Sequence, residues 1–248
     1  ADLHGPLAWN GGTGTATTLL GVIDSGVYSQ HPDLAANLWS NPSEPIDGVD
    51  NDGNGFIDDA FGVNTYTRSA SFSDCNGHGT HVAGIIGARG DNGIGVSGVN
   101  WTTSMVVVGT AKSCNGSAPL TAILDAYDYF VDLKRRGHNI RVINASFGGE
   151  GEVAAEFAAI NRLLKVDILL VAAAGNDGHS IDSHPLYPAS YDLSNIIAVG
   201  ATGPTLQRAA YSNYGLGVDI MAPGGDSDYT DGMILSTYSP DATAGGLY

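Results

Sequence analysis

Short apolar runs alternate with segments of helical periodicity along the 248 residues of this chain, and no other feature constrains its fold as much. The first run ends at Asp24 and Gly26 and the last is closed by Pro223-Gly224, and the lengths of the runs are typical of strands buried in a parallel sheet. The runs lie at 19–23, 105–108, 141–143, 168–173, 196–199 and 218–221.

Two segments between the runs have apolar residues three and four positions apart, which is the pattern of an amphipathic helix. One covers 120–131 and ends before Gly137, and the other covers about 152–165. A further apolar helix is expected at 82–88. Strands and helices in alternation predict an α/β fold with three layers, a mostly parallel β-sheet with helices on both faces. No internal repeat interrupts this order, so we expect one domain over residues 1–248.

The chain is strongly acidic, with 26 Asp and Glu residues against 10 Lys and Arg residues and a formal net charge of −16. This balance argues against a nucleic-acid partner, because phosphate binding depends on basic patches. The apolar runs are too short to span a bilayer. Two cysteines are too few for a disulfide scaffold and would close at most one bridge.

Three polar residues stand where a parallel sheet places its functional site, beyond the carboxyl ends of the strands. Asp24 follows the first apolar run, Asn176 follows the fourth, and His78 precedes the helix expected at 82–88. A serine that attacks an amide needs a base, a carboxylate that orients the base, and a donor for the oxyanion. The residue types predict His78 as the base, Asp24 as the carboxylate and Asn176 as the oxyanion donor.

Five sequence blocks, in the same order along the chain, resemble those of subtilisin-like serine peptidases. They are the aspartate block at 22–27, the histidine block at 78–84, the substrate-binding strand at 144–149, the oxyanion block at 173–176, and the following stretch at 187–189 with 198–201. The resemblance runs from about residue 15 to the end of the chain. It implies a secreted endopeptidase that hydrolyses peptide bonds through an Asp-His-Ser triad and an acyl-enzyme.

The resemblance also implies where a polypeptide substrate in extended conformation would bind. The peptide would add as a strand to two backbone edges and would place a bulky apolar side chain against small residues. The residues implied are Ser146, Phe147, Gly148, Gly116, Ser117, Ala174 and Gly175.

The family places its nucleophilic serine in a Gly-Thr-Ser-Met-Ala block, and the 248 residues contain no such block after Ile234-Leu235-Ser236-Thr237. The serine could belong to a separate C-terminal fragment, could lie beyond the end of this sequence, or could be missing from a non-catalytic relative. We expect a C-terminal fragment of the same protein to carry it, and we expect the 248 residues alone to be inactive. A catalytically inactive, calcium-stabilised module that binds extended peptides is the alternative function.

Residues 50–58 space their oxygen donors as an EF-hand calcium loop does, with a glycine at the sixth position. Phe61 occupies the twelfth position, where a glutamate is usual, so Asp47 or Asp59 would have to replace it. An acidic turn without a metal is the alternative. The predicted Ca²⁺ ligands are Asp50, Asp52, Asn54, Phe56 through its carbonyl, and Asp58.

A second Ca²⁺ site is implied by the family resemblance, at Asp33 and the loop 90–96. Its ligands would be oxygen atoms only, which suits calcium better than zinc, and a plain glycine turn is the alternative. They are Asp33, the side chain of Asn92, and the carbonyls of Gly90, Ile94 and Val96.

Cys75 and Cys114 occupy positions where some secreted relatives carry a disulfide. The resemblance therefore implies a bridge between the histidine loop and the substrate-binding edge, and an oxidising compartment such as the extracellular space. Two free thiols are the alternative.

Overall fold

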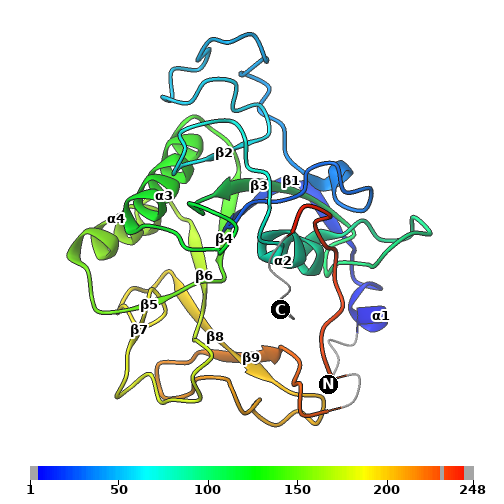
Figure 1. Ribbon diagram of the computed structural model, residues 1–248, viewed down its shortest axis with the longest axis vertical. Helices are drawn as coiled ribbons and strands as arrows, with labels where there is room; N and C mark the ends of the chain where they lie inside the picture. Colours follow the sequence, from blue (N-terminus) through cyan, green and yellow to red (C-terminus); the bar gives the residue numbers. More distant parts are fainter. Residues whose placement is uncertain (1–4, 230–231, 243–248) are drawn as a thin grey trace. The chain divides into compact units, whose positions relative to one another are not determined.

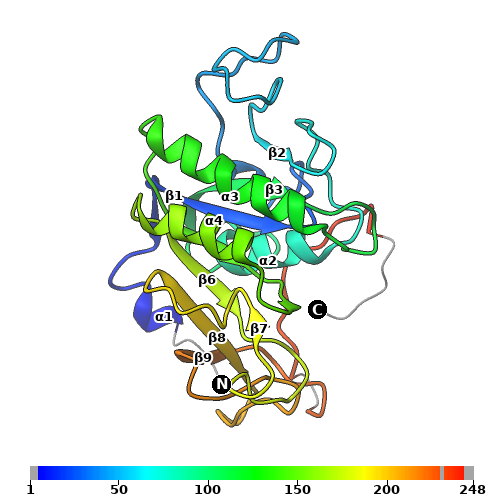
Figure 2. The same cartoon turned by 90° about the vertical axis from the view of Figure 1, so that its left-hand side faces the viewer.

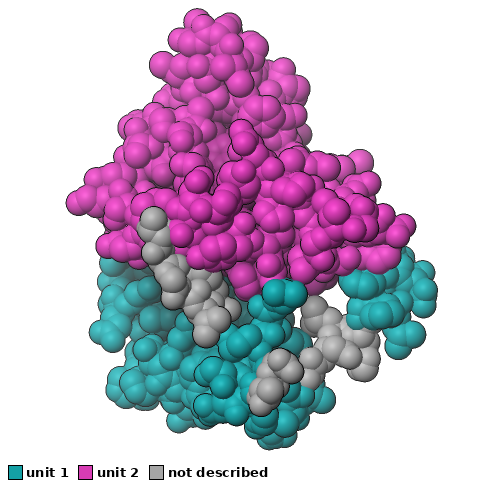
Figure 3. Space-filling model, turned by 45° about the vertical axis from the view of Figure 1, so that its right-hand side comes forward, with its two compact units in different colours: residues 1–12, 144–235 teal, residues 13–143, 236–248 magenta. Residues whose placement is uncertain are grey.

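The structure is a computed structural model that describes residues 5–229 and 232–242 (Figure 1). The chain forms two compact units (Figure 3). What we call the first unit comprises residues 13–143 and 236–248 and is unit 2 in Figure 3, drawn in magenta. What we call the second unit comprises residues 1–12 and 144–235 and is unit 1 in Figure 3, drawn in teal. The single peptidase domain expected over residues 1–248 stays a prediction.

Parallel strands form the centre of the first unit, in the order β2-β3-β1-β4. β1 (Gly14–Asp24) pairs with β3 (Thr102–Gly109), so that Val22 lies opposite Val107, and β3 also pairs with β2 (Gly62–Asn64). β4 (Ile140–Ala145) begins in this unit. The inner residues of β1 and β3 are buried on both faces, which explains why these strands are continuous apolar runs rather than alternating ones.

Helices cover both faces of these strands, as Figure 2 shows for α2 (His78–Gly87) and α3 (Leu120–Arg135). Successive side chains of a strand point to opposite faces. Val22 therefore packs in one cluster with Ala83 of α2, whereas a side chain at Gly21 would collide with Phe130 of α3. The first unit thus has three layers, and it also contains a short 3-10 helix, η1 (Ala35–Asn37).

The second unit contains three parallel strands in the order β6-β8-β9. Its helix α4 is amphipathic and buries Ala159, Ile160 and Leu163. A separate antiparallel pair joins β5 to β7. The elements are α1 (Gly5–Ala8), β5 (Gly149–Glu150), α4 (Ala154–Leu164), β6 (Leu169–Ala173), β7 (Leu186–Tyr187), β8 (Ile196–Thr202) and β9 (Ile220–Pro223).

The predicted fold class, α/β with a mostly parallel sheet, is confirmed. Three details differ from the sequence prediction. α2 begins at His78 and not at 82, because polar side chains from elsewhere cap its first turn. β9 starts two residues later than the run at 218–221. The β5–β7 pair was not expected, since two-residue strands leave no periodicity to read.

Within the described residues, no helix combines the length and the apolar character that crossing a bilayer requires.

Candidate active site and cation sites

Asp24 and His78 meet at the carboxyl end of β1 in the first unit. Asp24 is the last residue of β1 and is buried, and His78 is the first residue of α2. The Nδ1 atom of His78 lies 2.7 Å from Oδ1 of Asp24. A carboxylate only accepts hydrogen bonds, so Nδ1 carries the proton, and Nε2 is left as the basic nitrogen.

The surroundings of His78 favour its protonated form. Burial lowers the pKa of His78, but the hydrogen bond and the charge of Asp24, together with the charge of Asp74, outweigh burial and hold the pKa above its ordinary value. The second oxygen of Asp24 is buried without a hydrogen-bond partner among the described residues. The pair therefore holds an imidazole that can accept a proton and be stabilised once it has done so.

The disulfide between Cys75 and Cys114 ties the histidine loop to the turn 112–117. Asn76 strengthens this link, because its Nδ2 donates to the carbonyl of Cys114 at 2.8 Å. A side chain at Gly116 would meet Asn76 at 3.1 Å. The structure thus brings Gly116 and the neighbouring Ser117 beside the loop of His78, within one unit.

Asn176 lies in the second unit, on the turn that follows β6, and it is exposed. Gly175, before it, has a φ of 109°, and a Cβ there would lie 2.3 Å from Nδ2 of Asn213. Both reasons require glycine at this position. The predicted residues Ala174, Gly175 and Asn176 therefore form one tight turn.

Asn213 holds this turn in place from a distant part of the chain, and sequence reasoning missed it. It is buried, and its side chain donates to the carbonyl of Ala174 at 2.9 Å. Its Oδ1 accepts from the backbone N–H groups of Asp177 and His179, both at 3.0 Å. It lies 37 positions after Asn176, so no local pattern signals this role.

Ser146, Phe147 and Gly148 follow β4 and lie outside the described strands. The side chain of Asn144 donates to Oγ of Ser146 at 2.9 Å. A Cβ at Gly148 would come within 2.8 Å of Leu186. This segment is therefore fixed at both ends inside the second unit.

The loop of the second predicted calcium site closes on Asp33 within the first unit. Asp33 is almost fully buried, and its Oδ1 accepts from Nδ2 of Asn92 at 2.7 Å. Its Oδ2 accepts from the N–H of Val96 at 2.8 Å and lies 2.2 Å from where a Cβ of Gly95 would be. The structure thus brings Asn92, Gly95 and Val96 of the predicted loop to Asp33.

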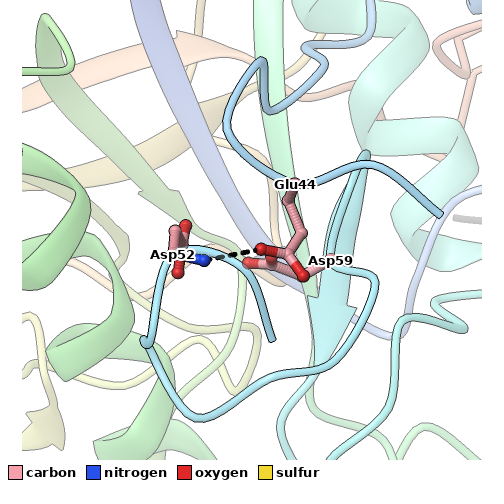
Figure 4. Close-up of side chains that lie close together, drawn as sticks. All are labelled: Glu44, Asp52 and Asp59. Carbon is pink, nitrogen blue, oxygen red and sulfur yellow. Dashed lines mark hydrogen bonds between the residues drawn. The ribbon is translucent and has the colours of Figure 1, made fainter. Parts of the chain in front are cut away.

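The carboxylates in and around the other predicted calcium loop have two kinds of surroundings. Some lie close to other acids, and others accept hydrogen bonds from backbone N–H groups. Glu44, Asp52 and Asp59 each offer an oxygen, and these atoms lie within 4.8 Å of one another (Figure 4). The dashed line in Figure 4 is the hydrogen bond from the N–H of Asp52 to Glu44, 3.0 Å long. Burial raises the pKa of Asp59, and the charges of Asp52 and Glu44 raise it further. This oxygen-only donor set fits a hard cation such as Ca²⁺.

Most of the predicted EF-hand positions have other partners. Asp50 accepts from the N–H groups of Asn54 and Gly55, at 3.0 and 2.9 Å. Asp58 accepts from the N–H groups of Asp47 and Gly48, both at 2.9 Å. Phe56 packs edge-on against Tyr129.

Of the predicted side-chain ligands, only Asp52 belongs to the group of three acids. Nδ2 of Asn54 donates to Asp59 at 2.8 Å. Sequence reasoning considered Asp59 as a replacement ligand but missed Glu44, which precedes the motif by six residues.

Comparison with known proteins identifies the class to which this parallel α/β fold, with its paired aspartate and histidine at a strand end, belongs. A model described as the subtilase family matches residues 15–246. The major intracellular serine protease of Bacillus subtilis is 32% identical over 224 residues, which are 90% of this chain and 62% of that protein. An extracellular protease of Xanthomonas campestris is 33% identical over 252 residues, 96% of this chain and 41% of that protein.

A solved structure agrees with these matches. The crystal structure of a cold adapted subtilisin-like serine proteinase has a TM-score of 0.68 and 26% sequence identity to this chain, and the match covers 92% of this chain and 67% of that one. The chain belongs to the subtilase family of serine proteases. It spans 37% and 47% of the length of two curated relatives with which it is 37% identical.

Proposed function

We propose that the protein is a serine endopeptidase that hydrolyses polypeptides through an acyl-enzyme. The observation that carries this proposal is the 2.7 Å hydrogen bond between Asp24 and His78, in a setting that raises the pKa of the histidine. His78 would take the proton of a serine hydroxyl and return it to the leaving amine, while Asp24 stabilises the imidazolium in between.

The nucleophile would be a serine whose proton His78 takes, and the family blocks described above do not contain it. Asn176 would donate its amide N–H to the oxyanion of the tetrahedral intermediate. An extended peptide would add along Ser146 to Gly148 and along Gly116 and Ser117 by backbone hydrogen bonds. Ala174 and Gly175 would leave space for the side chain that precedes the cleaved bond.

Calcium would stabilise two loops of the first unit. Glu44, Asp52 and Asp59 would hold one ion, and their mutual repulsion without a cation supports this assignment. Asp33, Asn92 and the carbonyls of Gly90, Ile94 and Val96 would hold the other. Bound ions would supply positive charge to buried carboxylates and would favour the folded loops.

Secretion is the compartment we propose, and the Cys75–Cys114 disulfide supports it because such bonds persist in oxidising surroundings. The relatives include an intracellular and an extracellular protease, so family membership leaves the compartment open.

A serine-directed fluorophosphonate probe tests the proposed activity on the full-length protein. We expect one labelled serine, and we expect His78→Ala to abolish labelling. A full-length protein that stays unlabelled at neutral pH, and yet binds extended peptides, would instead be the inactive peptide-binding module. No described feature favours that module over the enzyme.

A further inference from the structure

A second buried carboxylate lies beside the Asp24–His78 pair. Asp74 is only 1% exposed, and its two oxygens accept five hydrogen bonds. The donors are the N–H groups of Asn76, Gly77 and Thr80 and the hydroxyls of Ser25 and Thr80, at 2.6 to 3.1 Å. All of them are neutral, and no ion pair involves Asp74 within the described residues. A buried carboxylate without a cation keeps its negative charge only when hydrogen bonds satisfy it this fully.

Asp74 caps the helix that carries His78. The N-cap of α2 is Gly77, which has no side chain to cap with. Oδ1 of Asp74 accepts from the N–H of Gly77 at 2.8 Å, and Oδ2 accepts from the N–H of Thr80 at 2.9 Å. One carboxylate therefore satisfies the start and the third residue of the first turn.

Ser25 joins the two carboxylates. Its N–H donates to Oδ1 of Asp24 at 2.7 Å, the same oxygen that accepts from His78. Its hydroxyl donates to Asp74 at 2.9 Å and accepts from the N–H of Gly79 at 3.0 Å. The end of β1 and the first turn of α2 are thus held in one continuous network of hydrogen bonds.

We propose that Asp74 is a positioning residue for the Asp24–His78 pair, holding the imidazole against Asp24 through Ser25 and the first turn of α2 and supplying a second negative charge that favours the imidazolium. The importance of this role for catalysis rests on the proposed function. The charges of Asp24 and Asp74 both act on His78, and both favour its protonated form.

A helix cap alone and a positioning residue make different predictions for His78. A cap that only stabilises α2 changes the melting temperature of the protein when it is removed, but leaves the titration of His78 where it was. Removing a positioning residue would also change the protonation of His78 and weaken its hydrogen bond to Asp24. The distinction can be measured on His78 itself, without any proteolysis.

The experiment is an NMR titration of full-length protein labelled with ¹³C at histidine Cε1 and aspartate Cγ. We expect Asp74→Asn to move the titration midpoint of His78 to lower pH and to weaken the downfield signal of its Nδ1 proton. Ser25→Ala keeps both carboxylates, so it should weaken the proton signal with a smaller change in midpoint. Asp192→Asn removes the same charge from an exposed position and should change neither.

An unchanged midpoint and an unchanged proton signal in a folded Asp74→Asn variant would overturn the proposal. If that variant does not fold, the titration of the wild-type protein tests the proposal. The Cγ signal of Asp74 should then shift with the same midpoint as the signal of His78. A Cγ signal that ignores the titration of His78 refutes the coupling. If the full-length wild-type protein is not labelled by the serine-directed probe, but Asp74 still affects the titration of His78, the proposed protease activity is rejected and the positioning role of Asp74 is retained.

Discussion

The loop that carries His78 and the loop from 41 to 61 both bury hydrogen-bonded carboxylates in the first unit, but the charges around these carboxylates differ. Asp74 accepts five hydrogen bonds and lies beside a histidine that it helps to charge. Asp59 lies among other carboxylates, and burial and their charges raise its pKa. The first region is organised by the chain alone, whereas the second, where Arg136 lies 3.8 Å from Asp52, would gain from a further cation.

The largest effect should come from the region organised by the chain. Asp24→Asn leaves the shape of the site but favours the wrong tautomer of His78, so we expect the rate of probe labelling in full-length protein to fall by about 10⁴. Asp192→Asn is the matched control and should label like the wild type. A loss of less than tenfold in Asp24→Asn would show that the pair does not activate the nucleophile.

Breaking the disulfide should test how far the histidine region depends on its covalent link. We expect the double variant Cys75→Ser with Cys114→Ser to lower the free energy of unfolding by about 2–4 kcal/mol, because the unfolded chain is no longer constrained. Urea unfolding of both proteins, with and without reductant, measures this. Reductant should lower the free energy of unfolding of the wild type only. An equal decrease in both proteins would show that the effect of reductant does not come from this disulfide.

Removing calcium should destabilise the acidic loop and leave the histidine region intact. With EDTA we expect the melting temperature to fall by several degrees, corresponding to about 2–3 kcal/mol for an ion at a hundred times its dissociation constant. In Glu44→Gln the fall should be smaller, since one ligand has lost its charge. A melting curve that EDTA does not change would reject both proposed calcium sites.

The smallest effect should be a pH dependence of the stability of the protein when the acidic loop holds no calcium. Because the folded-state pKa of Asp59 is raised, its ionised form opposes folding, and this cost is fully present above the folded pKa and is relieved as the pH falls through it. Asp59→Asn should therefore be more stable than the wild type in EDTA at pH 7, by about 1 kcal/mol. The difference should vanish below the ordinary aspartate pKa of 3.8.

The pKa of His78 is also raised, so the stability that it contributes depends on pH in the same direction as that of Asp59, beginning from a higher ordinary value. The stability that the imidazolium of His78 contributes is fully present below the ordinary value of 6.5 and is lost as the pH rises through the folded pKa. Unfolding curves of wild type and His78→Ala between pH 5 and pH 9 measure it. A difference between the two that does not depend on pH would contradict the raised pKa.

The strand-helix order of the fold could be predicted because its strands are buried on both faces. Val22, Ile23, Val107 and Val108 are fully buried, so the strands had to be apolar throughout and stand out in the sequence. The short elements could not be predicted. β2 and β5 have three and two residues, and their existence depends on partners far along the chain.

Asp24, His78 and Asn176 stand out in the sequence because each directly adjoins an apolar run or a glycine turn. The residues that support them do not. Asn213 and Ser25 hold backbone groups that only the fold brings near, and Glu44 joins Asp52 and Asp59 from outside the calcium-loop spacing.

The sequence by itself determined the family and the residue types of the site, because chemistry restricts which side chains can serve as base, carboxylate and oxyanion donor. Tertiary structure alone decided which carboxylates are satisfied and which are crowded. Asp74 and Asp59 are the same residue type, and only folding gives them different surroundings. Asp74 accepts hydrogen bonds on both oxygens, whereas Asp59 accepts from Tyr129 and Asn54 and also lies near other carboxylates.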